Sequence, residues 1–474
     1  MNSEYALAFS AYIGVLGLIT FAFYYFKNNQ PVPTTTSGHS HAEQEFLLGN
    51  RSIGSLATAI AAHSSDMSIW LFTGLPGSVY LFGMQKAWLV IGLTVGMYLC
   101  WTFVAEKLRI NTEKHESYTL SGYFEEHFQD TTGRIRLFSA LFALLFSVFY
   151  ISSGLVGLGI TLESVFGMDY HYGILIGLTI TILYTLIGGF ASIAWCDLFQ
   201  GLFMVFMIVL VPLYGYTFLE NGISSITTIA QLKHISLSII PATWSELFSY
   251  IMLAVGWGLG YFGQPHILVN FMGIKDPSSI KKARTIGMIW QLFAICAVLA
   301  VGLIGIGMFP ESLVNSELVF VLMVQKLFTP LFAGFILCAI IAAALTTIDT
   351  QVLVSATVVS QDLYKRFINP QASSRHTLFV SKLGIILVPT LSFLIAFNRS
   401  ASVYTLVEYA WMGLGSAFGP VVLVALYSKR VTAKKALIGM IVGGSLAALW
   451  PLLNTGIPAM IPAFSTNILL LLFI

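Results

Sequence analysis

Long apolar stretches of about 20 residues alternate with short polar segments along the whole chain. A helix of that length crosses the hydrocarbon core of a bilayer, so the pattern predicts an all-α polytopic membrane protein. About 13 transmembrane helices are expected, and they lie at about 5–26, 47–77, 83–105, 137–165, 172–190, 197–218, 246–272, 286–308, 318–360, 377–397, 402–427, 433–452 and 459–474. The stretch 318–360 is too long for one straight crossing. Its first part, through Thr329-Pro330, is expected to form a separate outer helix.

The two ends of the chain and the polar segment 28–45 differ from the regular apolar stretches. The first apolar stretch has no preceding basic region and no small-residue cleavage site, so we expect a retained span and not a signal peptide. The final stretch is short for a span, which leaves open an incomplete last helix or a truncation. Segment 28–45 is expected to be a solvated polar loop, and a metal site at His39 and His41 is the less favoured alternative.

Composition agrees with a membrane protein. Hydrophobic residues make up 57% of the 474 positions and charged residues only 9%, where a soluble chain carries about a quarter. The net charge of +2 is spread over short loops, so no nucleic-acid partner is expected. The cysteines lie in or beside apolar stretches and form no CxxC pair, which argues against a disulfide framework or a zinc site.

The distribution of basic residues predicts the orientation. When the N-terminus is placed outside, 19 of the 23 Lys and Arg residues fall in cytoplasmic loops. Lys86, Lys233 and Arg399 then lie in outer segments, and Lys326 lies within an apolar stretch. Because cytoplasmic loops of membrane proteins carry an excess of Lys and Arg, we expect a multi-pass protein of the cell (inner) membrane with its N-terminus outside.

Two apolar segments carry glycine and proline at similar places. The first contains Asp66 within SSDMS (64–68), followed by GLPG (74–77), and the second reads GWGLGYFGQP (256–265). A carboxylate in a membrane helix costs about 3 kcal/mol and marks a functional site by default. Paired discontinuous helices, here five helices apart, are typical of inverted-repeat transporters with a substrate site between the repeats. The alternative is that the glycines only allow helices to pack closely.

A third segment, AAALTTIDT (342–350), adds hydroxyls and a carboxylate to a membrane helix. Thr346, Asp349 and Thr350 stand at i, i+3 and i+4 and therefore share one face, whereas Thr347 points to a neighbouring face. Hydroxyl and carbonyl oxygens suit a small hard cation. The alternative is that the threonines bond back to carbonyls of their own helix, although the nearby carboxylates favour a cation site.

These segments resemble the sodium:solute symporter family, and most closely its sodium/proline symporter branch. The resemblance covers essentially the whole chain and rests on FLLGNRSIG (46–54), SSDMSIWLFTGLPG (64–77), YTLIGGFASIAWCDLFQG (184–201), GWGLGYFGQPHIL (256–268), AAALTTIDTQ (342–351), DLYKRF (362–367) and YAWMGLGSAFGPVVL (409–423). It implies a leucine-transporter-type fold of 5+5 core helices. The inverted repeats would span 47–218 and 246–427, with peripheral helices at 5–26 and 433–474.

Matching positions imply the site residues. The sodium site would use main-chain oxygens of Ser64, Met67 and Ala343 and the hydroxyls of Thr346 and Thr347, with Asp66 supplying negative potential beside the ion. The substrate positions would be Ser68, Trp70, Tyr150, Trp257, Tyr261, Gln264 and Pro265. An aromatic-walled pocket suits a proline ring, and a half-helix N-terminus or hydroxyls would meet its carboxylate.

Four residues depart from the pattern of the proline symporters. Ile69 replaces a glycine and would narrow the cavity or reshape the unwound turn, and Asn270 replaces an arginine. Asp349 and Glu408 replace small polar residues. We hypothesise that Asp349 forms a second cation or proton site with Asp197 and with Thr350 or Thr346. The alternative is that Asp349 and Glu408 are neutral or paired structural groups.

The function expected from the resemblance is inward symport of L-proline with sodium, by alternating access, and not an enzymatic activity. A monomer would suffice because each core encloses its own site. A different small amino acid or organic solute is the first alternative. A transporter-like sensor and an intramembrane aspartyl protease are the rivals from other classes. No signalling module and no protease motif accompanies the carboxylates.

Overall fold

The computed structural model describes residues 3–28, 41–399 and 402–473. Throughout these residues the protein is built from helices, and the one isolated β-bridge joins Ile53 to Ile274. Nine of the described helical segments are long and apolar enough to cross a membrane, which is consistent with the predicted spans. The expected all-α membrane architecture is therefore confirmed.

The helices fall into long ones, half-helices and short ones. The long helices are α1 (Ser3–Asn28), α5 (Ala87–Cys100), α8 (Arg134–Phe166), α9 (Tyr170–Tyr216), α13 (Ile280–Met308), α15 (Pro330–Thr357), α16 (Ser374–Ala396), α17 (Val403–Tyr427), α18 (Ala433–Leu449) and α19 (Met460–Phe473). The half-helices are α3 (Ser55–Asp66), α4 (Gly74–Phe82), α11 (Trp244–Gly260) and α12 (Pro265–Gly273). The short helices are α2 (His41–Leu48), α6 (Glu106–Lys114), α7 (Leu120–Phe128), α10 (Ile223–Leu232) and α14 (Val319–Leu327).

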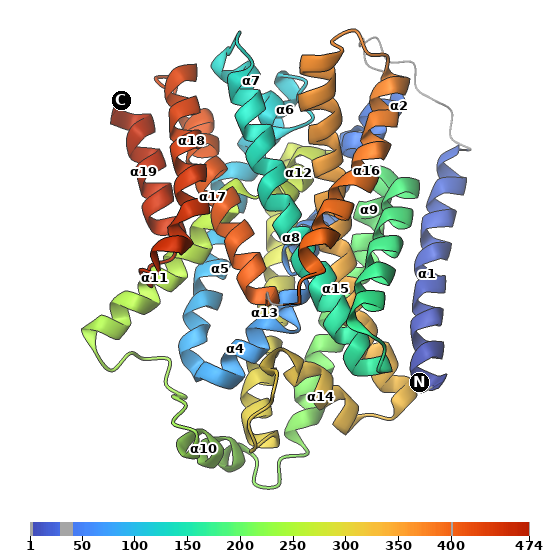
Figure 1. The fold of residues 1–474 in the computed structure, drawn as a ribbon, viewed down its shortest axis with the longest axis vertical. Coiled ribbons are helices and arrows are strands. Elements are labelled where there is room, and N and C mark those ends of the chain that lie inside the picture. The colour runs from blue at the N-terminus through green and yellow to red at the C-terminus, as the bar shows by residue number, and fades with distance from the viewer. Residues whose placement is uncertain (1–2, 29–40, 400–401, 474) are drawn as a thin grey trace.

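Short 3-10 and π segments complete the chain. The 3-10 segments are η1 (Gly49–Arg51), η2 (Ile69–Leu71), η3 (Gly83–Lys86), η5 (Tyr261–Gly263), η6 (Pro277–Ser279), η7 (Ser316–Leu318) and η9 (Trp450–Leu453). The π segments are η4 (Trp101–Ala105) and η8 (Val358–Ile368), which continue α5 and α15. In Figure 1, α1 lies at one side of the molecule and α18 and α19 lie at the other, so the ends of the chain flank the remaining helices.

Both predicted helix interruptions are present; the first lies just before its glycine-proline run, and the second lies within its run. The first separates α3 from α4 over residues 67–73, and GLPG (74–77) forms the first turn of α4. The second separates α11 from α12 at η5 and Gln264, and Pro265 begins α12. Proline fits the first helical position because its missing N–H has no partner there in any helix.

Close helix packing also explains several of these glycines. A Cβ added to Gly258 would lie 2.7 Å from the carbonyl oxygen of Gly92, and one added to Gly92 would lie 2.0 Å from that of Ala254. The backbones of α5 and α11 therefore touch, as small residues permit in membranes. The two explanations of the glycines are both correct, because the helices break and also pack closely beside the breaks.

Two further predictions about the spans concern the helix before Pro330 and the stretches now joined in α9. Thr329-Pro330 separates α14 from α15, so the separate outer helix predicted before Pro330 is confirmed. The two apolar stretches 172–190 and 197–218 correspond to the two parts of α9, which turn at Gly189 with φ 67° and ψ 175°. Only glycine adopts that conformation without strain.

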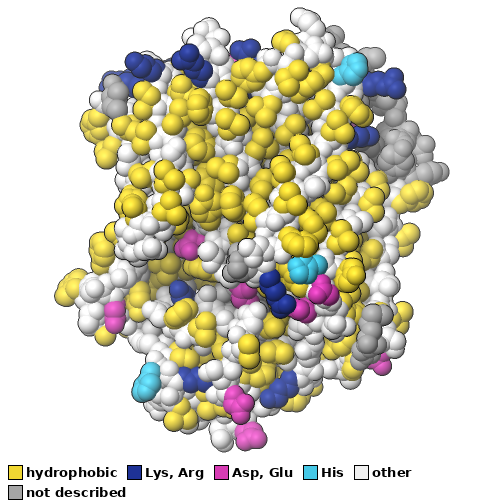
Figure 2. Space-filling model, in the orientation of Figure 1, with side chains coloured by type: hydrophobic (Ala, Val, Ile, Leu, Met, Phe, Trp, Pro, Cys, Tyr) yellow, Lys and Arg dark blue, Asp and Glu magenta, His cyan; other side chains and the backbone are white. Residues whose placement is uncertain are grey.

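Parts of the chain expected to be loops are helical. The last five residues of the predicted loop 28–45 belong to α2, which begins at His41, while His39 lies outside the described residues. α7 and α10 were not predicted because they are too short to give a membrane-length apolar stretch. Figure 2 shows a broad hydrophobic surface over the upper half of the molecule, with Lys and Arg along its upper edge and side chains of both charges in the lower half.

Candidate functional site

The two helix breaks meet at Asp66 and Tyr261. Asp66 is the last residue of α3, and Tyr261 is the first residue of η5. The Tyr261 hydroxyl donates a 2.6 Å hydrogen bond to Oδ2 of Asp66. Both side chains are fully buried, so the bond joins the two discontinuous helices in an environment without competing water.

The unwound turn after Asp66 is held by hydrogen bonds to the carbonyl oxygen of Asp66. The Asp66 carbonyl oxygen accepts hydrogen bonds from the Trp70 indole at 3.2 Å and from the Tyr150 hydroxyl at 3.3 Å. It also accepts the amide of Ser68 at 2.9 Å. The carbonyls at the end of a broken helix lose their helical donors, and here side chains from η2 and α8 replace them.

Oxygen atoms gather where α3 meets α15. The Thr346 hydroxyl lies 3.0 Å from the Ser64 carbonyl oxygen and 3.2 Å from the Ala343 carbonyl oxygen. The Thr347 hydroxyl is buried and has no hydrogen-bond partner among the described residues. Unwound carbonyls and the C-terminal end of a half-helix are the groups that bind sodium in transporters with broken helices. These atoms therefore fit a sodium ion, and they include four of the predicted ligand residues.

Aromatic rings surround the second break. The ring of Trp257 lies 6.1 Å from that of Trp70, 6.1 Å from that of Trp411 and 5.7 Å from that of Tyr404. The Trp411 ring is also in edge contact with Tyr261 at 4.9 Å. The predicted substrate positions on η2, α11 and η5 are thus brought together, and α17 contributes aromatic residues that the sequence reasoning did not name.

Several buried polar atoms near the breaks have no hydrogen-bond partner in the part of the chain that the structure describes. They are Oδ1 of Asp66, the Ser68 hydroxyl, the Trp257 indole nitrogen and Oε1 of Gln264. Gln264 is held in place because its amide group donates to the carbonyls of Gly260 and Trp411. Unpaired buried polar groups are costly, so a set of them around the two breaks indicates a place for a polar ligand.

The residues of the hypothesised second site also lie together. The Thr350 hydroxyl lies 3.4 Å from Oδ2 of Asp197, which joins α15 to α9. Asp349 accepts the backbone amide of Thr350 at 2.7 Å. Both carboxylates are buried, and each keeps one oxygen without a hydrogen bond within residues 41–399 and 402–473. A shared cation or proton would compensate these two groups.

The two departures next to the breaks are accommodated by their neighbours. Ile69 is fully buried against α8, where a Cβ added to Gly157 would lie 2.5 Å from its Cδ1 atom. The larger side chain therefore occupies the space that Gly157 leaves. Asn270 is buried in α12, and its amide group donates to the carbonyl of His266 at 2.9 Å.

A polar chain of three side chains was missed by the sequence reasoning. The Ser147 hydroxyl donates to Gln351 at 3.0 Å, and the Gln351 amide nitrogen lies 2.9 Å from Nδ1 of His266. This chain ties α8 and α15 to the first turn of α12, directly after the second break. The sequence offered only weak signals for it, namely His266 in the QPHI block and Gln351 after the threonines.

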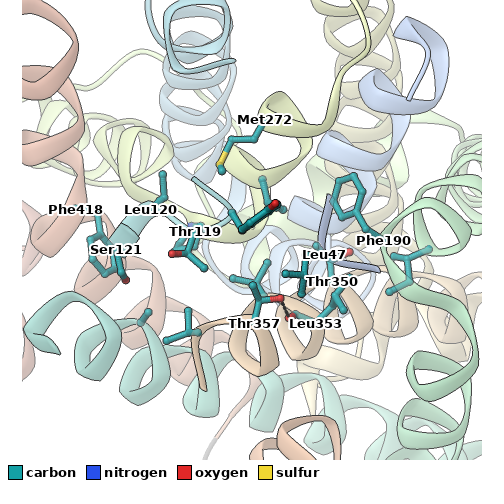
Figure 3. Close-up of a pocket in the computed structure, with 17 residues that line it drawn as sticks. Leu47, Thr119, Leu120, Ser121, Phe190, Met272, Thr350, Leu353, Thr357 and Phe418 are labelled. Carbon is teal, nitrogen blue, oxygen red and sulfur yellow. Dashed lines mark hydrogen bonds between the residues drawn. The ribbon is translucent and has the colours of Figure 1, made fainter. Parts of the chain in front are cut away.

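A narrow cavity of about 30 Å³ lies beside α12 and α15 at the Lys- and Arg-rich end. Figure 3 shows its mostly apolar lining, which comes from distant parts of the chain and includes Thr119 and Thr350. The volume holds at most a few water molecules. Among the described residues there is no group of three or more His, Cys, Asp or Glu side chains that could hold a transition metal.

Comparison with protein families and relatives gives a consistent result. The model of the sodium:solute symporter family matches residues 46–443. A high-affinity proline transporter of Bacillus subtilis (strain 168) is 38% identical over 438 residues, covering 91% of this chain and 92% of the relative. A sodium/proline symporter of Escherichia coli (strain K12) is 39% identical over 429 residues, covering 89% and 85%.

Solved structures extend the comparison to the fold. A sodium-coupled sialic acid symporter in a substrate-bound outward-open state superposes with a TM-score of 0.80 at 19% identity, covering 99% of this chain and 96% of that chain. The transporter MhsT in complex with L-phenylalanine gives a TM-score of 0.57 at 13% identity, covering 88% and 98%. At these identities the likeness concerns the fold alone.

Proposed function

The chain belongs to the sodium:solute symporter family, and on that premise we propose that it carries L-proline into the cell together with sodium. Its fold is of the leucine-transporter type, and it is a multi-pass membrane protein and not an enzyme. The observation that carries the proposal is the meeting of the two helix breaks at the Asp66–Tyr261 hydrogen bond. Sodium-dependent uptake of labelled proline by the purified protein in proteoliposomes tests it.

The sodium ion is assigned to the oxygen cluster between α3 and α15. Its ligands would be the carbonyls of Ser64, Met67 and Ala343 and the hydroxyls of Thr346 and Thr347. Support comes from the short distances around Thr346 and from the partnerless Thr347 hydroxyl among the described residues. The C-terminal end of α3 adds the negative end of its helix dipole, and Asp66 adds negative potential.

Proline is assigned to the space between the two breaks. As a zwitterion it offers two N–H donors and a carboxylate, and the partnerless atoms there include both acceptors and donors. Asp66 Oδ1 and Gln264 Oε1 would accept, while the Trp257 indole and the Ser68 hydroxyl would donate. Trp70, Tyr150, Tyr261 and Pro265 would enclose the ring. Identity with proline transporters over most of the chain supports this substrate.

Sodium binding and proline binding would be coupled because both ligands would contact the end of α3. Thr346 reaches the carbonyl of Ser64 on α3, and Tyr261 reaches Asp66 at the end of the same half-helix. A sodium ion at this junction would fix the end of α3 and thereby orient Asp66 toward the substrate. Alternating access would then arise from movement between two inverted repeats, spanning 47–218 and 246–427, with 5–26 and 433–474 as peripheral helices.

A second cation or proton site is assigned to Asp197, Asp349 and Thr350. Two carboxylates buried beside one hydroxyl are expensive unless a positive charge compensates them. The contact from Thr350 to Asp197 and the partnerless oxygens within the described ranges support the assignment. The alternative is that the carboxylates are neutral and structural, in which case the number of ions transported per proline would not depend on Asp349.

We also propose an orientation for the chain in the membrane. With the N-terminus outside, most Lys and Arg residues lie on the cytoplasmic side of the cell membrane. One chain would be sufficient for transport, since the proposed sites lie within a single set of broken helices. Another small amino acid or organic solute is the alternative substrate. Competition of labelled proline uptake by a panel of unlabelled amino acids and carboxylates would distinguish these substrates.

A further inference from the structure

Two of the cavities at the end of the molecule that is outermost in the proposed orientation lie beside α17. One has a volume of about 470 Å³ and lies between α11, α17 and the segment that joins α18 to α19. The other has about 410 Å³ and lies between α4, α17 and η7. Lys86 and Tyr404 line both. The face shown in Figure 2 is hollowed in its lower half, and acidic and basic side chains gather around the hollow.

The larger cavity is lined by one cation and one anion, Lys86 and Glu408. Lys86 ends η3, between α4 and α5, whereas Glu408 lies in the second turn of α17. Neither side chain has a hydrogen bond or ion pair with another described residue, and the Lys86 ammonium lies 4.7 Å from the centre of the Phe82 ring. Two opposite charges thus line the same cavity and interact electrostatically, without a hydrogen bond or ion pair between them.

The other charges around the two cavities have partners. Arg399 forms a salt bridge with Glu163, and Glu317 accepts the backbone amide of Tyr404 at 3.4 Å. Lys86 and Glu408 are therefore the charges still available to a ligand in this pair of cavities. Both are only partly exposed, so an ion pair with a ligand would be screened less than one on the open surface.

A chain of aromatic contacts connects the lining of the cavity to the central site. Tyr404 lines the cavity, and the Tyr404 ring contacts Trp257, which in turn contacts Trp70 beside the first break. Trp70 donates to the Asp66 carbonyl at the Asp66–Tyr261 junction. A small molecule held in the cavity would enter the central site when these rings separate.

We propose that Lys86 and Glu408 form an outer binding site that captures zwitterionic amino acids before they pass Trp257. The site rests on the proposed symport function. Lys86 binds the carboxylate of the amino acid, and Glu408 binds its ammonium group, which in proline is a secondary ammonium. An anion or a cation alone would leave one of the two charges unpaired, which is why the site favours a zwitterion. The volume of 470 Å³ lies within the usual range for small-molecule sites.

Initial rates of labelled proline uptake into proteoliposomes at saturating sodium test this site. Lys86→Met and Glu408→Gln are expected to raise KM for proline about tenfold, while kcat and the sodium concentration for half-maximal rate change less than twofold. Lys86→Arg and Glu408→Asp keep the charges and should stay within about threefold of the wild-type KM. Glu220→Gln neutralises an exposed glutamate outside both cavities and should change nothing.

The double variant Lys86→Met/Glu408→Gln distinguishes binding of the zwitterion from a simple ion pair between Lys86 and Glu408. If each side chain binds one end of the zwitterion, KM rises further in the double variant than in either single one. A double variant no worse than the singles would overturn the site, because the two side chains would then serve only each other. An unchanged KM in both single variants, or a fall in kcat at constant KM, would also overturn it.

A failure of the proposed proline transport can be distinguished from a failure of the outer site. If the wild-type protein takes up no proline, the proline assignment is wrong, while the outer site is still tested by equilibrium binding of a panel of labelled zwitterionic amino acids to the wild-type protein and the same variants. Tighter binding by the wild type than by Lys86→Met and Glu408→Gln would support the site. Equal binding by all three would refute it.

Discussion

The hydroxyl of Tyr261 donates a 2.6 Å hydrogen bond to Asp66 and so ties one broken helix to the other. The distance is typical of a hydroxyl that donates to a charged carboxylate. Oδ2 of Asp66 is occupied by this bond, and Oδ1 has no partner among the described residues. Asp66 can therefore hold the two helices together and still accept a hydrogen bond from a ligand.

Removal of the Tyr261 hydroxyl is expected to weaken transport. In Tyr261→Phe, Asp66 keeps its place but loses its buried donor, which costs about 1.5–3 kcal/mol for a bond to a charged group. We expect kcat/KM for proline to fall by roughly 10- to 100-fold. Tyr123→Phe is the matched control, because the Tyr123 hydroxyl is buried in α7 without a partner in the described residues. Equal effects of both variants would contradict the role of Tyr261.

The threonines of α15 are expected to set the affinity for sodium. Thr346→Ala removes the hydroxyl between the carbonyls of Ser64 and Ala343, and Thr347→Ala removes the partnerless hydroxyl. Each variant should raise the sodium concentration for half-maximal uptake about tenfold or more, whereas Thr346→Ser should restore it. Loss of one ligand oxygen at about 1.4 kcal/mol gives that factor.

Thr357→Val serves as the control for these two variants. Its hydroxyl bonds back to the carbonyl of Leu353 in the same helix, so it is not a proposed ligand. The dependence of uptake on sodium should match the wild type. A sodium dependence that is unchanged in Thr346→Ala and Thr347→Ala would show that the ion binds elsewhere.

The second cation site predicts a change in stoichiometry. Asp349→Ser removes one of the two buried carboxylates, so the ratio of sodium to proline, measured by parallel uptake of labelled sodium and labelled proline, is expected to change. Ser355→Ala alters a buried hydroxyl further along α15 and should leave the ratio as it is. If Asp349→Ser keeps the wild-type ratio, Asp349 is structural and the second-site hypothesis is wrong.

A buried ion pair between α8 and η8 is expected to stabilise the fold. Arg136 of α8 forms salt bridges of 2.8 Å with Asp362 and 3.0 Å with Glu125, and the Asp362 side chain is 0% exposed. Arg136→Met would leave Asp362 buried without its cation and should lower the free energy of unfolding by about 3–5 kcal/mol. Thermal unfolding of the purified protein measures this change.

Arg399→Met is the control for the buried pair. Arg399 also forms a salt bridge with a glutamate, Glu163, but its side chain is 60% exposed. Pairs of this kind contribute about 0–1 kcal/mol, so the transition should barely shift. Adding Asp362→Asn to Arg136→Met should recover part of the lost stability, because the uncompensated charge is removed. No recovery would mean that Arg136 acts through packing alone.

Local patterns in the sequence predicted the membrane helices and both interruptions because apolar length and glycine-proline runs are local signals. The second interruption follows Gly260, within the glycine run, as predicted. The first follows Asp66, several residues before GLPG, where the Trp70 and Tyr150 side chains replace the lost helical donors. The short helices α2, α7 and α10 escaped prediction because eight to ten residues give no membrane-length apolar signal.

The candidate site was predictable only in part. Asp66 and the face shared by Thr346, Asp349 and Thr350 follow from spacing and charge. The remaining members came from the family resemblance. Contacts such as Gln351 with His266, or Trp411 with Trp257, join segments far apart in the chain, and no local pattern encodes them. The fit of Ile69 likewise depends on Gly157, 88 positions later in the chain.

Uptake of labelled proline into proteoliposomes under an inward sodium gradient tests the central claim most directly. With the membrane potential held at zero, proline should accumulate inside well above its external concentration. Replacement of sodium by choline, or dissipation of the gradient with a sodium ionophore, should abolish the accumulation. Proline that only equilibrates across the membrane, or enters equally well without sodium, would contradict sodium-coupled symport.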